Sequence, residues 1–262
     1  MSSLYPLPDA HHAAPHRTAG DSRCEFFLGQ NAGTELLQDL QRARRSIVVV
    51  SPYASVKLLE QLGERQAAGV HVTLVTTTDA GRGVGPALVQ QTRHIDTRAK
   101  ELRSHLKIGG VAAIVVMVLV AFWMAMDQAW AAFGVAVLGA AAGALAYQYG
   151  ENLRIYSYSY RYLFPAVRVF ESPYGNGHPS RNPRRMFVHS KAYVIDGEVA
   201  YLGSLNFTSS GMTHNYESCV RFTEPGAVGR IAAMVDSLCT GTGWDTRDAA
   251  SWGPALYDEP AN

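Results

Sequence analysis

A short stretch late in the chain combines an imidazole with an ammonium group. His189 and Lys191 lie two residues apart in a run rich in β-branched and aromatic residues, a composition that predicts a strand. Side chains at positions i and i+2 of a strand point to the same face, so we expect both groups to project into one cleft. A nucleophilic imidazole beside a cation is suited to displacement at a phosphodiester without a metal ion.

Further polar residues follow the expected strand. The strand should end at a turn that begins with Asp196, and residues 199–203 predict the next strand. Ser204 and Asn206 come directly after it, again two residues apart, and Glu217 lies farther along. A phosphodiester carries negative charge on its equatorial oxygens, so a site that attacks it needs cations and hydrogen-bond donors there. Ser204 and Asn206 are candidates for such donors.

These residues resemble the signature of the phospholipase D superfamily. The chain shares with that family the pattern His-x-Lys-x4-Asp, the pattern Gly-Ser-x-Asn that begins at Gly203, and the later glutamate. The resemblance also covers residues 30–77, where a helix, a strand, a second helix and a second strand are expected. It implies an α/β fold in which a mixed β-sheet is sandwiched by helices.

The resemblance also assigns roles to the site residues. His189 is the expected nucleophile and would form a phosphohistidine intermediate, while Glu217 accepts a hydrogen bond from its ring and fixes its tautomer. Asp196 is counted with this set, although its place at a strand end favours a role in holding the turn. The expected catalytic residues are His189, Lys191, Asp196 and Glu217, and the expected phosphate-binding residues are Lys191, Ser204 and Asn206.

One motif histidine does not supply both groups that the reaction needs. In-line displacement requires a nucleophile on one side of phosphorus and a general acid on the other. A symmetric dimer would bring His189 of each subunit to a shared two-fold axis, and single-motif members of the resembled family behave as homodimers of this kind. We therefore expect the chain to pair with itself. The sequence has no acidic cluster that suggests a catalytic metal, so we expect neither a metal nor another cofactor.

Two uncharged runs, residues 108–126 and 129–147, interrupt this pattern. Each is about long enough to cross a hydrocarbon core of roughly 30 Å, and a buried hairpin in a soluble protein is the alternative. Gly139 and Gly143 would permit close contact between the two helices. Lys and Arg residues flank both runs but are missing from the turn between them. The positive-inside bias then predicts an integral protein of the inner (cytoplasmic) membrane, with its catalytic domain on the cytoplasmic side.

The domain organisation follows from these runs. We expect one phospholipase D-like domain that is interrupted by a transmembrane helical hairpin and flanked by two tails. A charged helix over residues 86–107 should lead into the first span. The expected parts are a disordered N-terminal tail (1–22), the first part of the domain (23–105), the hairpin (106–150), the second part with the catalytic motif (151–250) and a C-terminal tail (251–262).

Composition narrows the functional classes. Of the 262 residues, 47% are hydrophobic and 17% are charged, and the apolar excess lies in the two uncharged runs. The formal net charge of +1 excludes a strongly basic nucleic-acid footprint over the whole chain. The three cysteines have no paired spacing, which fits a reduced compartment. Two arginine clusters remain, of which the second could steer a phosphate or simply be solvated: Arg42, Arg44 and Arg45, and Arg181, Arg184 and Arg185.

A row of tyrosines follows the second uncharged run at alternate positions. It could form an interfacial belt beside the bilayer, the packing face of a strand or a stacking platform for bases. His214, between Asn206 and Glu217, is a further candidate for substrate binding. The row consists of Tyr156, Tyr158, Tyr160 and Tyr162.

Three functions from different classes remain. The leading hypothesis is a membrane-anchored phosphodiesterase of phospholipase D type that hydrolyses membrane phospholipids, because the hairpin would hold the cleft near them. The alternative enzyme is a metal-independent endonuclease acting on DNA or RNA, since one fold hosts both activities. A membrane scaffold with an inactive domain is disfavoured because every motif residue is intact.

Overall fold

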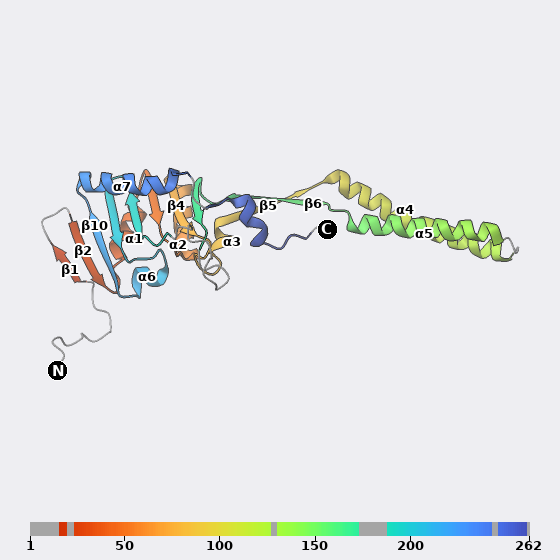
Figure 1. The fold of residues 1–262 in the computed structure, drawn as a ribbon, viewed down its shortest axis with the longest axis horizontal. Coiled ribbons are helices and arrows are strands. Elements are labelled where there is room, and N and C mark those ends of the chain that lie inside the picture. Colours follow the sequence, from red (N-terminus) through yellow and green to blue (C-terminus); the bar gives the residue numbers. More distant parts are fainter. Residues whose placement is uncertain (1–15, 20–23, 127–129, 173–187, 243–245, 261–262) are drawn as a thin grey trace, which may run out of the picture. The chain divides into compact units, whose positions relative to one another are not determined.

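The chain folds into two units, and the computed structural model describes residues 16–19, 24–126, 130–172, 188–242 and 246–260. The first unit comprises residues 1–90 and 161–256, and the second comprises residues 91–160 and 257–262. Both units are therefore discontinuous in sequence, because residues 91–160 of the second unit are inserted within the first and residues 257–262 follow it (Figure 1). The arginine cluster at residues 181–185 and most of the tail expected at residues 1–22 lie outside the described residues.

A large mixed sheet forms the first unit. Strands β3, β4 and β7 run parallel to one another, while the other neighbouring pairs are antiparallel. Among the described residues the sheet has nine strands, in the order β1 (His16–Ala19), β2 (Cys24–Gly29), β10 (Glu217–Phe222), β9 (Val199–Gly203), β8 (Ala192–Ile195), β3 (Ser46–Val50), β4 (His71–Thr77), β7 (Ala166–Phe170) and β11 (Thr246–Arg247).

The parallel core of the sheet is the predicted β-α-β unit. Strand β3 leads through helix α2 (Val56–Ala67) to β4, and these apolar strands are buried because helices cover both faces. Gly69 ends the helix with a left-handed φ of 93°, a conformation that favours glycine. Strand β1 was not expected, because it lies in a segment predicted to be disordered; it pairs with β2 along the edge of the sheet.

Helices lie on both faces of this sheet. Helix α7 (Pro225–Thr240) packs Val228 and Val235 against one face, where Val194 of β8 belongs to the same buried cluster. The next residue along the strand, Tyr193, points to the opposite face. Its register partner Tyr201 donates a hydrogen bond from that face to a residue of helix α1 (Thr34–Arg42). The predicted class, a mixed β-sheet sandwiched by helices, is confirmed.

The remaining short elements belong to the connections of the first unit. They are α3 (Val84–Leu88), α6 (Ser209–Thr213), α8 (Ala249–Trp252) and the 3-10 helix η2 (Gly253–Ala255).

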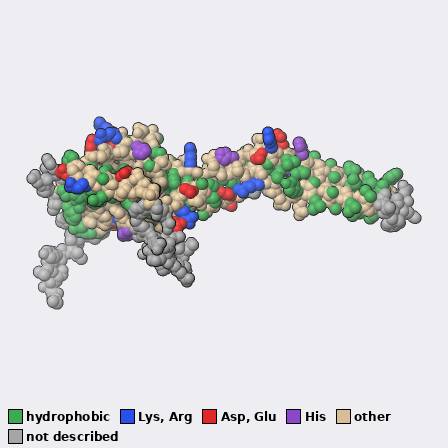
Figure 2. Space-filling view, turned by 45° about the horizontal axis from the view of Figure 1, so that its top comes forward, with side chains coloured by type: hydrophobic (Ala, Val, Ile, Leu, Met, Phe, Trp, Pro, Cys, Tyr) green, Lys and Arg blue, Asp and Glu red, His purple; other side chains and the backbone are tan. Residues whose placement is uncertain are grey.

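The second unit contains two long apolar helices, α4 (Thr97–Met126) and α5 (Trp130–Asn152). Both are long and apolar enough to cross a membrane, and of their most apolar stretches only 6% and 17% is buried. Figure 2 shows hydrophobic side chains gathered over the surface of these helices. The hairpin therefore exposes its apolar surface in the described structure, unlike the core helices of a soluble domain.

The two helices run antiparallel and touch through glycines. A Cβ atom added to Gly143 would lie 2.9 Å from the carbonyl oxygen of Gly110, and one added to Gly110 would lie 2.6 Å from that of Gly143. A Cβ on Gly139 would lie 2.8 Å from the sulfur of Met117. The expectation of close helix contact at Gly139 and Gly143 is confirmed, and the contact is made within one hairpin.

The prediction of a helix over residues 86–107 is wrong for most of the first half of this segment. Residues 89–95 form strand β5 (Val89–Ile95), which pairs with β6 (Tyr156–Tyr162), and α4 begins only after Asp96. The carboxylate of Asp96 accepts the backbone N–H of Ala99, as an N-cap does. The tyrosine row therefore lies on a strand. The described part of the expected C-terminal tail also has structure, since the Tyr158 hydroxyl donates to the carbonyl oxygen of Pro260.

Candidate active site

The site residues gather where the parallel strand β3 ends. Strand β8 runs antiparallel to β3 with Val50 opposite Ala192, so the chain just before Ala192 lies at the carboxyl end of β3. His189 and Lys191 occupy this segment. The prediction that both lie on a strand is wrong by a few residues, since β8 begins at Ala192. Extended pairing does reach the carbonyl oxygen of Lys191, which accepts the backbone N–H of Gly203 at 3.4 Å.

The imidazole and the ammonium group meet directly. The Nζ atom of Lys191 lies 3.1 Å from Nδ1 and 3.3 Å from Nε2 of His189, and it donates to the carbonyl oxygen of the same histidine at 2.9 Å. His189 is exposed, whereas Lys191 is only 8% exposed. An ammonium can donate to the ring only through a nitrogen with a free lone pair, which is also what a nucleophilic imidazole requires.

Burial changes the electrostatics of this pair. Removal from water lowers the pKa of Lys191, and the negative charge of Glu217 offsets part of that effect. Glu217 therefore lies close enough to act on the ammonium group. A cation held in a poorly hydrated position interacts more strongly with an approaching anion than one in open solvent does.

Glu217 is engaged by two polar side chains. The Ser204 hydroxyl donates to one of its carboxylate oxygens, and the Asn215 amide donates to the other at 3.1 Å. The Ser204 oxygen in turn accepts the backbone N–H of Ser218 at 2.9 Å. In this arrangement the proton of Ser204 points to the carboxylate. A role in phosphate binding, as expected from the sequence, would require that hydroxyl to turn.

The glycine of the Gly-Ser-x-Asn pattern has a packing reason. A Cβ atom on Gly203 would lie 2.2 Å from the carbonyl oxygen of Ser218 on β10, which no side chain could tolerate. The close approach of β9 and β10 at this point brings Ser204 to Glu217. Asn206 follows on a turn, and its Oδ1 atom is buried without a hydrogen-bond partner among the described residues.

Asp196 lies at the other end of β8. Lys191 and Asp196 flank this strand, about 16 Å apart along an extended chain. The Asp196 carboxylate accepts the backbone N–H groups of Arg44, Arg45 and Ser46 at 2.9, 2.7 and 2.8 Å. Asp196 itself has a left-handed φ of 54° in the turn between β8 and β9. The structure therefore separates Asp196 from the histidine and lysine, and the position supports a role in holding the turn rather than in catalysis.

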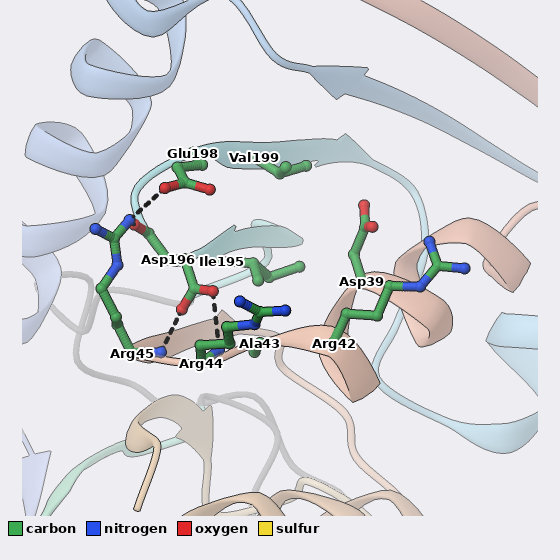
Figure 3. A pocket seen from close by; sticks show the side chains of 9 residues that line it. All are labelled: Asp39, Arg42, Ala43, Arg44, Arg45, Ile195, Asp196, Glu198 and Val199. Carbon is green, nitrogen blue, oxygen red and sulfur yellow. Dashed lines mark hydrogen bonds and ion pairs between the residues drawn. The ribbon is translucent and has the colours of Figure 1, made fainter.

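The first arginine cluster surrounds this same turn. A cavity of about 480 Å³ opens beside Asp196, and Figure 3 shows Arg42, Arg44 and Arg45 along it. Arg45 forms an ion pair of 2.6 Å with Glu198. The cavity lies at the opposite end of β8 from His189, so it is not the site of the expected chemistry.

His214 was a further candidate for substrate binding. His214 has its Nδ1 atom 2.6 Å from the Thr213 hydroxyl. Within the described residues, no group of three His, Cys, Asp or Glu side chains could hold a metal ion. Sequence reasoning missed Ser51 and Asn215, and the only signal for Ser51 was its position at the end of an apolar parallel strand.

Replacing Asp196 should reduce stability in a pH-dependent way. Burial raises the pKa of this carboxyl group, but its three backbone hydrogen bonds and Arg45 outweigh burial and lower it below 3.8. Asp196→Ala should lower the free energy of unfolding at pH 7 by about 2 to 3 kcal/mol. Because the folded pKa is lowered, this stabilisation is complete above the unfolded pKa and is lost as pH falls through the folded pKa.

Chemical unfolding in mild detergent between pH 7 and pH 2 would measure this difference. Glu198→Ala is the matched control, because the Arg45–Glu198 pair has side chains that are 64% and 70% exposed and should contribute little. Equal losses in the two variants would contradict the role assigned to Asp196.

Replacing Lys191 with an apolar side chain should not reduce stability. At pH 7 the folded protein holds a cation whose pKa burial has lowered, and Lys191→Met removes that cost. The melting temperature of the variant at pH 7 should equal or exceed that of the wild type. Between the folded pKa and the ordinary value of 10.5 the unfolded chain binds more protons, so the wild type should gain stability relative to the variant as pH rises.

Thermal unfolding at pH 7 and pH 10 tests this expectation, with Lys57→Met on the exposed side of α2 as the control. A fall in melting temperature for Lys191→Met at pH 7 would show that the ammonium stabilises the fold.

One family model matches part of the chain. Residues 154–239 match the family model described as "Cardiolipin synthase, PLD-like domain". No match was found among curated protein sequences.

Solved structures with a similar fold include the phospholipase D family member Nuc from Salmonella typhimurium, with 13% identity, a TM-score of 0.43, and coverage of 86% of this chain and 97% of that one. NucT from Helicobacter pylori has 10% identity and a TM-score of 0.42, with 86% and 98% covered. Phosphatidylserine synthase from Haemophilus influenzae Rd KW20 has 11% identity and a TM-score of 0.40, with 87% and 40% covered.

Similarity at this level carries no argument about function. The family match is more specific, because residues 154–239 include the histidine and lysine in contact, the Gly-Ser-x-Asn turn and Glu217. Residues 154–239, about a third of the chain, are therefore similar to a PLD-like domain.

Proposed function

We propose that this protein is a membrane-anchored phosphodiesterase of phospholipase D type that hydrolyses phospholipids. The observation that carries the proposal is the contact between the Lys191 ammonium and the His189 imidazole, inside the matched domain. The choice of phospholipid is supported by α4 and α5, which are long and apolar enough to span a bilayer. The description of the matched family as cardiolipin synthase also favours a lipid phosphodiester.

The proposed reaction has two steps. A ring nitrogen of His189 attacks phosphorus, so that an N–P bond forms while the bond from phosphorus to the leaving oxygen breaks. A second imidazole protonates that oxygen and releases the head-group alcohol. The same imidazole then takes a proton from water, whose oxygen attacks the phosphohistidine. Phosphatidic acid and the free His189 result.

The negative charge on the phosphate oxygens must be stabilised by cations and hydrogen-bond donors throughout both steps. The partly dehydrated ammonium of Lys191 faces the developing negative charge, and the Asn206 amide supplies a further donor. Ser204 could donate after its proton turns away from Glu217. The negative charge of Glu217 raises the pKa of Lys191. We propose that Glu217 also orients the His189 ring when substrate is bound.

The second imidazole is proposed to come from a second copy of the chain. Each subunit has one His-x-Lys-x4-Asp pattern, and a two-fold axis through the site would pair His189 with its equivalent. One ring starts neutral and the other protonated, a division that imidazoles achieve near neutral pH.

The proposed placement is in the inner membrane, with the hairpin inserted between two parts of one domain. The charged side chains near the domain side of the hairpin are mostly basic, and the positive-inside bias favours the cytoplasm for that side. The basic ones are Arg98, Lys100, Arg103 and Lys107 before the apolar part of α4, and Arg154 after α5.

A direct comparison of substrates tests the proposal. Purified protein in EDTA should release phosphatidic acid from labelled phospholipid vesicles, and it should leave single-stranded DNA and RNA intact. His189→Asn should reduce turnover by about 10⁴-fold or more, because it removes the nucleophile. Lys191→Ala should reduce it by about 10²-fold to 10³-fold with the fold retained. Cleavage of nucleic acid without cleavage of lipid would instead support the endonuclease.

Mixing subunits tests the shared site. If two His189 side chains serve one site, wild-type protein reassembled with an equal amount of His189→Asn protein should retain about a quarter of the activity of an equal total amount of wild type, because about a quarter of the dimers are then wild type throughout. Independent sites would retain about half. Mixing with His71→Asn, which changes an exposed histidine at the far end of β4, should leave the activity unchanged.

A further inference from the structure

The turn that presents Asn206 is held by two hydroxyl groups from neighbouring strands. On one side of Asn206, the Tyr193 hydroxyl donates to the carbonyl oxygen of Leu205 at 2.7 Å. On the other side, the Ser51 hydroxyl accepts the backbone N–H of Phe207 at 2.9 Å. Tyr193 belongs to β8 and Ser51 directly follows β3, so both hydroxyls come from the sheet.

These contacts are fully enclosed. Tyr193 and Phe207 are each 1% exposed, and Ser51 and Leu205 are 0% exposed. The rings of Tyr193 and Phe207 also pack with their centroids 6.1 Å apart. Burial raises the pKa of Tyr193, so its hydroxyl keeps its proton and remains a donor. Because water does not reach these groups, it cannot replace either hydrogen bond once the hydroxyl is removed.

The buried Oδ1 atom of Asn206 has no hydrogen bond to a described residue that would fix the side chain. The backbone of the turn is instead fixed, since the carbonyl oxygen of Asn206 accepts the N–H of Thr208 at 2.7 Å and that of Phe207 accepts the N–H of Ser55 at 3.0 Å. The position of the amide therefore depends on the position of the turn.

We propose that Tyr193 and Ser51 are positioning residues, which hold the turn so that the Asn206 amide can meet the phosphate. This inference rests on the proposed phosphodiesterase function. A donor in an active site is effective only when its supporting contacts keep it close to the productive geometry, and a displacement of about 1 Å can cost about 10²-fold in rate. The two hydroxyls act through Asn206 and do not touch the substrate.

Tyr201 provides a matched control. It is the register partner of Tyr193 on β9, is 0% exposed and also uses its hydroxyl, which donates to Asp39 at 2.5 Å. That hydrogen bond leads to α1 and not to the Asn206 turn. Tyr201→Phe removes a buried hydroxyl that donates to Asp39 and accepts from the Nε atom of Arg221 at 3.1 Å, so it should cost at least as much stability as Tyr193→Phe does. The comparison therefore separates loss of stability from loss of positioning.

Kinetics of the full-length protein on phospholipid vesicles form the first test. Tyr193→Phe and Ser51→Ala should each lower kcat about tenfold and change KM by less than about twofold. Tyr201→Phe should lower the melting temperature at least as much as Tyr193→Phe does and leave kcat unchanged. In an Asn206→Ala background, Tyr193→Phe should cause no further loss, because the group that it positions is gone. A second tenfold loss in that background would overturn the proposal.

Hydrogen exchange gives a readout that does not depend on activity. Amide exchange of the peptide covering residues 203–208 should become faster in Tyr193→Phe and Ser51→Ala but not in Tyr201→Phe. If the wild type hydrolysed no phosphodiester, the proposed function would fail while exchange still reported whether the hydroxyls hold the turn. If the wild type were active and Tyr193→Phe equally active, with unchanged exchange, the positioning role alone would be overturned.

Discussion

The site depends on an unfavourable placement, a lysine that is 8% exposed at the end of a central strand. Removing an ammonium group from water costs free energy unless nearby groups compensate. The carbonyl oxygen of His189 and the charge of Glu217 compensate in part, yet the pKa of Lys191 is still lowered. An anionic substrate would supply the missing countercharge. The burial that reduces stability thus suits the site to the proposed phosphodiester substrate, and the surrounding sheet must be stable enough to maintain it.

Much of the fold could be predicted from short-range patterns in the sequence. The β3–α2–β4 unit follows from apolar runs and a closing glycine, and the spacing of His189 and Lys191 indicates that they act together. Strand β5 could not be predicted in this way, because its polar and charged residues are equally typical of an exposed helix. Its strand conformation depends on pairing with β6, which lies far along the sequence. The bond from Ser204 to Glu217 was equally hidden, since it depends on how closely β9 and β10 approach.

Asp196, a residue of the His-x-Lys-x4-Asp pattern, holds a turn through its carboxylate. Its three backbone partners lie about 150 positions earlier in the sequence, so no local pattern could reveal them. By joining the β8–β9 turn to the start of β3, the carboxylate fixes one end of the strand whose other end leads to Lys191. Strand β8 is short, and its pairing with β3 on one side and β9 on the other sets its register. Fixing one end of β8 therefore helps to fix the position of its other end.

The glycine contact in the hairpin limits how two copies can associate. Gly110 and Gly143 already face each other within one chain, and a surface filled by its own neighbour is not available to another molecule. The outward sides of α4 and α5 carry bulky side chains such as Phe122 and Leu138, which keep adjacent backbones farther apart. Close backbone packing between hairpins is thus precluded where Gly110 meets Gly143, so the proposed pair of subunits would have to associate through other surfaces.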